Sequence, residues 1–363
     1  MLLAWGALLT ACAPTPDPGG KVSVTDALGA DDTQGYARAL EPRNFIFPRD
    51  HGPHPEYRNE WWYLTGNLDT PQGRRFGFQV TFFRIALAPD MPVRGSRWAS
   101  RQVWMGHAAL TDVTGRRHLA RERFARGALG LAGAQPAPFR VWLDDWQLYG
   151  AEDGFPWRLE LETEAFGLVL ELEPSKPPVL QGERGLSRKS ATPGNASYYY
   201  SLPRLASRGS VTLDGQRLPV EGLAWLDREW STSALEPDQA GWDWLSLQLR
   251  DGRDLMYYRL RYPDQSAHPS SAGSLVEPDG TVIPLDADDL AMQPSAWWTS
   301  ESGRRYPVGW ELELPGGERM RIRTPVPDQE MDLTVNYWEG AVDARDPDSG
   351  ALLGRGYLEL AGY

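Results

Sequence analysis

A polar segment near the N-terminus places acid–base side chains directly ahead of an aromatic run. Within residues 47–68, Asp50, His51, His54 and Glu60 precede a doubled tryptophan. Histidine and carboxylate side chains are common general acids and bases, and they also recognise polar groups of ligands. We therefore take His51, His54 and Glu60 as candidate catalytic residues.

The same segment permits two other interpretations. Imidazole and carboxylate groups bind zinc when three or four of them converge. Prolines interrupt the segment, however, so no helical face holds His51 and His54 together, and we expect no metal. Arg49 and Arg58 could instead pair with the carboxylates in a purely structural network. Acid–base chemistry, ligand recognition and a structural role all stay open.

A second charged segment spans residues 225–233. Strand alternation would send Asp227 and Glu229 to one face, and Arg228 and Trp230 to the other. Two carboxylates that face a cavity can act as an acid–base pair. The alternative is an interdomain salt-bridge network with Arg228, because joints between domains are usually polar. Asp227 and Glu229 are the remaining candidate catalytic residues.

The chain is rich in rings, with 16 Trp and 14 Tyr. Most rings must form the core, but a cavity for a hydrophobic ligand would use the surplus. The rings near the two charged segments, or in strand-like runs that resemble them, are our candidates for ligand binding: Trp61, Trp62, Tyr63, His107, Trp230, Trp242, Trp244 and Tyr258.

Charge and motifs exclude several classes of function. The net charge is −12 with pI near 5.0, and no stripe of Lys and Arg offers contacts to phosphates, so we expect no nucleic-acid partner. There is no Gly-x-Ser-x-Gly elbow of a serine hydrolase. There is also no glycine-rich nucleotide fingerprint between a strand and a helix, and we expect no cofactor.

Short strand-like runs follow one another over most of the chain. They alternate in polarity, and Gly, Pro, Asp or Asn stands in each break. Helical periodicity is nearly absent; residues 121–126 are the best short candidate, and residues 34–41 could form one or two turns. The pattern predicts an all-β protein with little helix.

The strand-like runs form a weak internal repeat. A Trp-rich hairpin at residues 60–85 is echoed at 242–260, and a closing hairpin at 209–226 is echoed at 340–360. Two copies of this length indicate a duplicated domain. Strands without covering helices close most simply into barrels. We therefore expect two consecutive lipocalin-like antiparallel β-barrels, with a leader and tether at 1–43, an N-terminal barrel at 44–233 and a C-terminal barrel at 234–363.

The N-terminus resembles a bacterial lipoprotein processing site. Cys12, the only cysteine, follows an apolar run that ends in small residues. Cys12 would then carry the lipid, and residues 13–32 would form a flexible tether. This predicts a signal peptide and a lipid-anchored protein of the bacterial cell envelope, periplasmic or otherwise extracytoplasmic.

Three motifs carry a resemblance to a known family. They are Phe47-Pro48-x-Asp50-His51-Gly52-x-His54-x-x-Tyr57-Arg58-x-Glu60-Trp61-Trp62-Tyr63-x-Thr65-Gly66-Asn67-Leu68, Trp225-Leu226-Asp227-x-Glu229-Trp230 and Gly241-Trp242-Asp243-Trp244. Together they resemble the AttH/CrtC-like lipocalin proteins, whose members are often called secreted hydrolases. The resemblance covers roughly residues 44–363.

The resemblance implies two lipocalin-like barrels, an association of some members with an ABC-type export system, and kinship to carotenoid hydratases and fungal pericyclases. In the hydratases it implies acid catalysis by a His-x-Trp and a Tyr-x-Asp. This chain has Arg228-Glu229-Trp230 at the first motif and no Asp at the second, near residues 257–260. Because a guanidinium is a poor proton donor, we expect the hydratase acid motif not to be retained.

Two hypotheses of function follow. In the first, a membrane-tethered lipocalin-like protein binds a hydrophobic or amphipathic small molecule or lipid, and can exchange it with ABC transporter components. In the second, it is an enzyme on such a molecule, a hydrolase, hydratase, isomerase or cyclase. Its acid–base groups would then be the five candidate residues named above.

Overall fold

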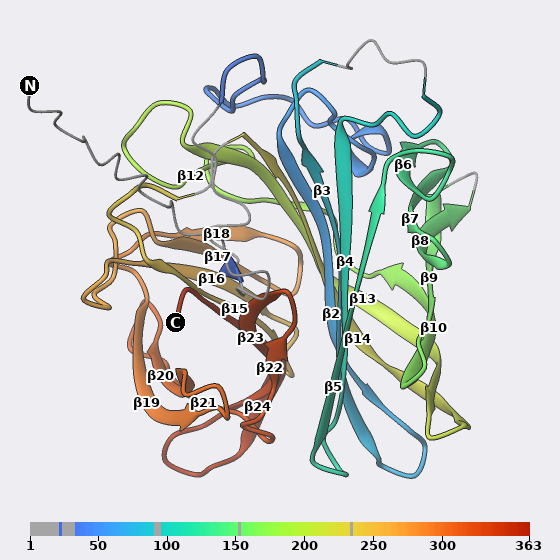
Figure 1. Cartoon of the computed structure of the whole chain (residues 1–363). Coiled ribbons are helices and arrows are strands. Elements are labelled where there is room, and N and C mark those ends of the chain that lie inside the picture. Colours follow the sequence, from blue (N-terminus) through green and yellow to red (C-terminus); the bar gives the residue numbers. More distant parts are fainter. Residues whose placement is uncertain (1–21, 24–32, 91–95, 152–153, 233–234) are drawn as a thin grey trace, which may run out of the picture.

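The described part of the chain folds almost wholly into strands of two antiparallel sheets (Figure 1). The computed structural model describes residues 22–23, 33–90, 96–151, 154–232 and 235–363. Within these residues the only helical element is the short 3-10 helix η1 (Arg49–His51). The predicted fold class, all-β with two lipocalin-like barrels, is confirmed.

The first sheet curls into a nearly closed barrel. Its main path runs β5-β4-β3-β2-β14-β13-β10-β9-β8-β7-β6, and β7 comes back into contact with β3, β4 and β5. The strands are β2 (Asn59–Asp69), β3 (Arg75–Ala86), β4 (Gln102–Asp112), β5 (Arg117–Arg126), β6 (Ala132–Pro136), β7 (Phe139–Leu143), β8 (Trp146–Ala151), β9 (Gly154–Glu162), β10 (Phe166–Pro174), β11 (Val179–Leu180), β12 (Leu186–Arg188), β13 (Ala196–Leu213) and β14 (Gln216–Ser231).

The second sheet forms a half-barrel. Its main path runs β18-β17-β16-β15-β24-β23-β21-β20-β19, and β1 and β22 both pair with β23. The strands are β1 (Val22–Ser23), β15 (Gly241–Leu249), β16 (Asp254–Arg261), β17 (Ala272–Val276), β18 (Val282–Leu285), β19 (Ala291–Thr299), β20 (Arg305–Glu313), β21 (Arg319–Arg323), β22 (Glu330–Asp332), β23 (Val335–Arg345) and β24 (Leu352–Ala361).

The strand order contains the repeat predicted from the sequence. The hairpins at 60–85 and 209–226 are neighbours in the order β3-β2-β14-β13, and their echoes follow the same order, β16-β15-β24-β23. The first sheet ends at Ser231 and β15 begins at Gly241, on either side of the predicted boundary after residue 233. Strand β1 lies within the predicted tether and belongs to the second sheet.

The prediction of a helix over residues 121–126 is wrong. These residues belong to β5, which pairs antiparallel with β4. No α-helix forms at 34–41 either. The charged residues of β5 suit a helix locally, but the open edge of β4 offers a complete set of backbone partners that a local pattern does not contain.

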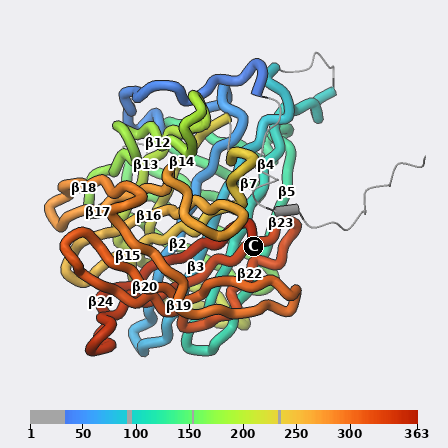
Figure 2. Tube along the Cα trace, turned by 90° about the vertical axis from the view of Figure 1, so that its left-hand side faces the viewer, coloured from blue at the N-terminus to red at the C-terminus, as the bar shows by residue number. Residues whose placement is uncertain are grey.

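The two barrels pack face to face, and Figure 2 shows strands of the second sheet in front of β2 and β3. Strand β23 contacts β3, and β24 contacts β2. Each barrel has its own apolar core, and two further apolar clusters combine residues of both sheets. Ion pairs add to the joint: Arg75 bonds Asp343 at 2.5 Å, and Lys176 bonds Asp254 at 2.8 Å.

Strand β2 is apolar on both faces because each face meets a different part of the protein. Trp62 and Leu64 belong to the core of the first barrel, whereas Trp61 and Tyr63 belong to the clusters between the barrels. An ordinary antiparallel strand has one face in water and alternates in polarity. The unbroken apolar run at 61–64 is therefore the signature of a strand between two packed layers.

A single glycine controls how closely β3 and β23 approach. A Cβ atom added to Gly77 would lie 2.6 Å from Cβ of Ala341. We expect Gly77→Ala to lower the free energy of unfolding by about 1–3 kcal/mol through overpacking. Adding Ala341→Gly should recover most of this loss, because it removes the opposing atom. Urea unfolding of the single and double variants checks this, and an equal loss in both would contradict the proposed contact.

Candidate functional site between the two barrels

A pocket lies between the two barrels. Side chains of β2, β3, β13 and β14 line one side, and side chains of β15, β16, β23 and β24 line the other. The cavity volume is about 110 Å³. A cavity of roughly 150 Å³ is large enough for benzene, so the enclosed space suits one small organic group.

Most of the predicted ligand-binding rings line this pocket. They are Trp61, Tyr63, Trp242, Trp244 and Tyr258. Trp62 and Trp230 instead belong to the core of the first barrel. His107 is fully buried behind the pocket, where its Nδ1 lies 2.7 Å from the hydroxyl of the pocket residue Tyr337.

Asp227 is held at the pocket wall by three donors. Its carboxylate accepts hydrogen bonds from Tyr199 (2.6 Å), Ser201 (2.5 Å) and the indole N–H of Trp225 (2.7 Å). Burial raises the pKa of Asp227 to about 7, although these hydrogen bonds oppose the rise. Tyr199 also accepts a hydrogen bond from Trp244 at 3.1 Å, which connects the network to the second barrel.

The second barrel contributes a pair of carboxyl groups. Glu339 of β23 and Glu359 of β24 are directly opposed in the ladder, so both side chains lie on the pocket face. Burial, and then the charge of Glu359, hold the pKa of Glu339 well above its usual range. Glu359 is partly exposed, yet its removal from bulk water raises its pKa to about 7. The pair therefore retains a proton near neutral pH.

Lys189 and Glu229 form an ion pair at the same pocket, with Nζ 3.1 Å from Oε1. The ammonium group also lies 4.2 Å from the ring centroid of Tyr258. Burial would lower the pKa of Lys189, but the neighbouring charge of Glu229 raises it above its usual value, so Lys189 stays charged. Its charge is balanced by Glu229 and leaves the other carboxyls without a cation.

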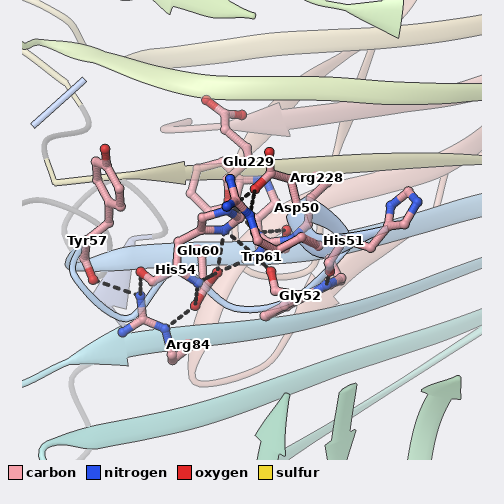
Figure 3. A network of polar contacts seen from close by, with 12 residues as sticks. Asp50, His51, Gly52, His54, Tyr57, Glu60, Trp61, Arg84, Arg228 and Glu229 are labelled. Carbon is pink, nitrogen blue, oxygen red and sulfur yellow. Dashed lines mark hydrogen bonds and ion pairs between the residues drawn. The ribbon is translucent and has the colours of Figure 1, made fainter. Parts of the chain in front are cut away.

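Glu60 lies in a different place, inside the first barrel (Figure 3). It is fully buried and forms ion pairs with both Arg84 and Arg228. Burial would raise the pKa of Glu60, but the two guanidinium groups outweigh it and hold the pKa well below its usual range. Arg228 also donates to the carbonyl of Gly52 at 2.6 Å, which ties the polar segment to β14.

His51 and His54 belong to this buried network and do not line the pocket. The ring of His54 stacks on Trp230 at a centroid distance of 3.7 Å, and its Nε2 lies 3.3 Å from Asp50. Nδ1 of His51 lies 2.6 Å from the hydroxyl of Tyr200, and burial lowers the pKa of His51 to about 3. The contacts of this segment fit the hypothesis of a purely structural network, because its charged groups pair with other buried groups of the first barrel.

The two carboxylates of β14 lie where strand alternation predicts. Asp227 and Glu229 line the pocket, whereas Arg228 and Trp230 are fully buried in the first barrel. Arg228 does not bridge the barrels, because its carboxylate partner Glu60 lies in the same barrel.

Sequence reasoning missed five polar side chains that line the pocket: Lys189, Tyr199, Tyr337, Glu339 and Glu359. A signal for the last two was available. Glu339 and Glu359 are single carboxylates within otherwise apolar strands at 337–342 and 356–360. A buried charge in such a run marks either an ion pair or a functional site.

Two further findings concern the described residues alone. Among them, no group of three or more His, Cys, Asp or Glu side chains is arranged to hold a metal ion. None of their helices is long and apolar enough to cross a membrane. Cys12, the predicted lipidation site, lies outside the described residues.

The fold and the pocket define a two-barrel lipocalin-like protein with an acidic, aromatic cavity at the joint. A sequence model of the AttH-like family matches residues 38–363, and the chain belongs to this family. A solved structure from Nitrosomonas europaea that is assigned to AttH is 39% identical, with a TM-score of 0.81, and the match covers 90% of this chain and 99% of that one.

More distant similarities extend to proteins named for other activities. Kievitone hydratase from Fusarium solani subsp. phaseoli is 23% identical over 145 residues, which span 37% of this chain and only 39% of that protein. The structure of kievitone hydratase from Nectria haematococca has a TM-score of 0.68 at 14% identity, covering 90% of this chain and 96% of that one. The structure of CghA with Sch210972 has a TM-score of 0.56 at 14% identity, and the match covers 92% of this chain and 96% of that one. At 14% identity, these structures show the shared fold alone.

Glu359 and Glu60 have opposite electrostatic environments, so we expect replacing each carboxyl by an amide to change the stability of the fold in opposite directions. The folded-state pKa of Glu359 is raised from its ordinary value of 4.5 to about 7. Between these two pH values the folded protein binds more protons than the unfolded chain, so the contribution of Glu359 to stability falls as the pH rises through this interval. Glu359→Gln should therefore be more stable than the parent by roughly 1–2 kcal/mol near pH 8, with a smaller difference near pH 5.

Glu60→Gln is the matched control. It leaves Arg84 and Arg228 without their carboxylate and should cost roughly 3–5 kcal/mol at neutral pH. Urea unfolding at both pH values measures the two effects. A loss of stability in Glu359→Gln that does not change with pH would show that this carboxyl is ionised throughout.

Proposed function

We propose that this protein binds a small, mainly apolar molecule between its barrels and catalyses acid–base chemistry on it. One observation carries the proposal. Carboxyl groups of both barrels, Asp227, Glu339 and Glu359, face one aromatic cavity, and burial raises the pKa of all three, to about 7 for Asp227 and Glu359. Groups poised near the working pH are effective general acids and bases.

The reaction class that this arrangement supports best is the addition of water to a carbon–carbon double bond, or its reverse. The Glu339–Glu359 pair gives its proton to one alkene carbon. Water adds through oxygen to the other carbon, and Asp227 accepts the proton that the water loses. The atoms balance with water as the only co-reactant, and pKa values of about 7 for Asp227 and Glu359 let each group both give and accept a proton near neutral pH.

The carboxyls can replace the proton donor that the chain lacks. In place of the histidine of the hydratase motif stands Arg228, which points into the first barrel and pairs with Glu60. The similarity to proteins named kievitone hydratase supports a hydration chemistry at this fold without giving the substrate.

Ligand binding without catalysis is the second candidate function. The rings of Trp61, Trp242 and Trp244 would hold an apolar group whether or not it reacts. The CghA structure with Sch210972 supports a small-molecule role for this fold. Burying several carboxyls without cations is unfavourable for a plain binding site, and this favours the enzyme.

Incubation in water labelled with heavy oxygen tests the proposed reaction. Purified protein is mixed with a panel of apolar unsaturated compounds, and products are analysed by mass spectrometry. We expect a product heavier by one labelled water. Because both groups move protons in the reaction, Asp227→Asn and Glu359→Gln should each lower the rate by about 100-fold or more.

Glu311→Gln is the matched control, because Glu311 lies on β20 away from the pocket and pairs with Arg321 at 2.6 Å. This variant should keep the parent's rate. Compounds that copurify or bind but never gain labelled oxygen would favour the second candidate. Unchanged rates in both pocket variants would remove the carboxyls from the mechanism.

We also propose, from the sequence alone, that the protein is lipid-anchored at Cys12 in the bacterial envelope and exchanges its ligand with an ABC-type transport system. Support for the anchor comes from the apolar run before Cys12, and support for the transporter comes from the family resemblance.

Metabolic labelling with a tagged fatty acid tests the anchor. The parent should incorporate the label and sediment with membranes, because acylation of Cys12 supplies the membrane affinity. Cys12→Ala should lose both properties, whereas label retained in that variant would place the acylation elsewhere.

A further inference from the structure

The pocket contains more acidic than basic side chains. Asp227, Glu229, Glu339 and Glu359 line it, and Lys189 is the only basic side chain among its described lining residues. Lys189 is already paired with Glu229 at 3.1 Å. An anionic ligand would therefore add like charge to the remaining carboxyls, which is unfavourable in an enclosed site.

Two polar atoms in the pocket, Oε2 of Glu339 and the hydroxyl of Tyr63, have no well-aligned hydrogen-bond partner among the described residues, although Tyr63 lies close enough to Glu339 to oppose the rise of its pKa. Glu339 is 1% exposed and Tyr63 is 5% exposed. A buried polar atom without a partner is costly, and in a native structure it commonly marks the position of a missing ligand or water. An entirely apolar neutral ligand would offer these two atoms no partner beyond each other.

Aromatic rings line the same space. Trp61, Trp242 and Trp244 line the pocket together with Tyr63 and Phe83. Aromatic faces attract cations, with tryptophan the strongest, and the attraction grows when water is excluded. The rings and the carboxyls without a paired cation therefore both favour a positively charged ligand in this cavity.

We propose that this pocket selects positive charge, so that it binds a small organic cation more tightly than a neutral molecule of the same shape. The inference rests on the proposed function and deepens it. Protonation of an alkene creates a positively charged carbon, and groups preorganised around that charge lower the barrier. The substrate class is then a neutral, electron-rich alkene, branched or conjugated, whose cationic form the rings and Glu339 stabilise.

A matched pair of probes tests the inference. Choline carries a quaternary ammonium, and its tert-butyl analogue has the same shape with carbon in place of nitrogen. Binding of each is measured by quenching of tryptophan emission and by saturation-transfer NMR. We expect the parent to bind choline at least about tenfold more tightly than the neutral analogue.

Variants locate the selectivity. Glu339→Gln should weaken choline binding by about tenfold and leave binding of the neutral analogue unchanged, because an amide of the same shape cannot ionise to balance a bound cation. Glu359→Gln provides a second, independent variant if Glu339→Gln does not fold, as judged by circular dichroism. Glu311→Gln, which lies away from the pocket, should bind both probes as the parent does.

The outcomes separate the two proposals. Equal or tighter binding of the neutral analogue to the parent overturns the inference and leaves the proposed function standing. Choline binding that neither pocket variant weakens also overturns it, because the cation must then bind elsewhere. If neither probe binds, the inference fails, and the incubation in labelled water decides the proposed function separately.

Discussion

The two-residue period of strands β2 and β14 decides which side chains reach the pocket. These strands lie between the core of the first barrel and the second barrel, so both of their faces are buried. Alternation sends Glu60 and Arg228 into the first barrel and Trp61, Asp227 and Glu229 to the pocket. A slip of one residue would exchange the two sets and place a guanidinium where the proposed acid–base groups lie.

Carboxyls in similarly enclosed places have opposite ionisation because their partners differ. Glu60 pairs with two arginines and lies beside His54, and it stays ionised. Glu339 faces Glu359 instead of a cation, and their pKa values rise. The first arrangement stabilises the fold, whereas the second stores a proton at neutral pH. Burial alone therefore does not separate structural from functional carboxylates; the nearest cation does.

The duplication explains why the pocket lies at the joint. Each copy contributes the same four neighbouring strands, β3-β2-β14-β13 and β16-β15-β24-β23, and these sets face each other. Asp227 comes from the first set, and Glu339 and Glu359 come from the second. The barrel interiors are filled by their own apolar cores, so the proposed site uses the outer faces of both sheets. Opposed outer faces also explain why so many tryptophans lie outside either core.

The sequence by itself determined the two-barrel fold and the face of β14 that carries Asp227 and Glu229. Both depend on period-two alternation and on turn residues, which are local. It also pointed to Trp61, Trp242 and Trp244, because paired rings in matching hairpins are visible without coordinates. Only the tertiary structure decided that Glu60 would meet Arg84 and Arg228, and that β5 would be a strand. It alone brought Glu339 and Glu359 to Asp227, across more than a hundred residues of sequence. Strand alternation assigns a side chain to a face of its sheet, but nothing local encodes which faces of two sheets will meet.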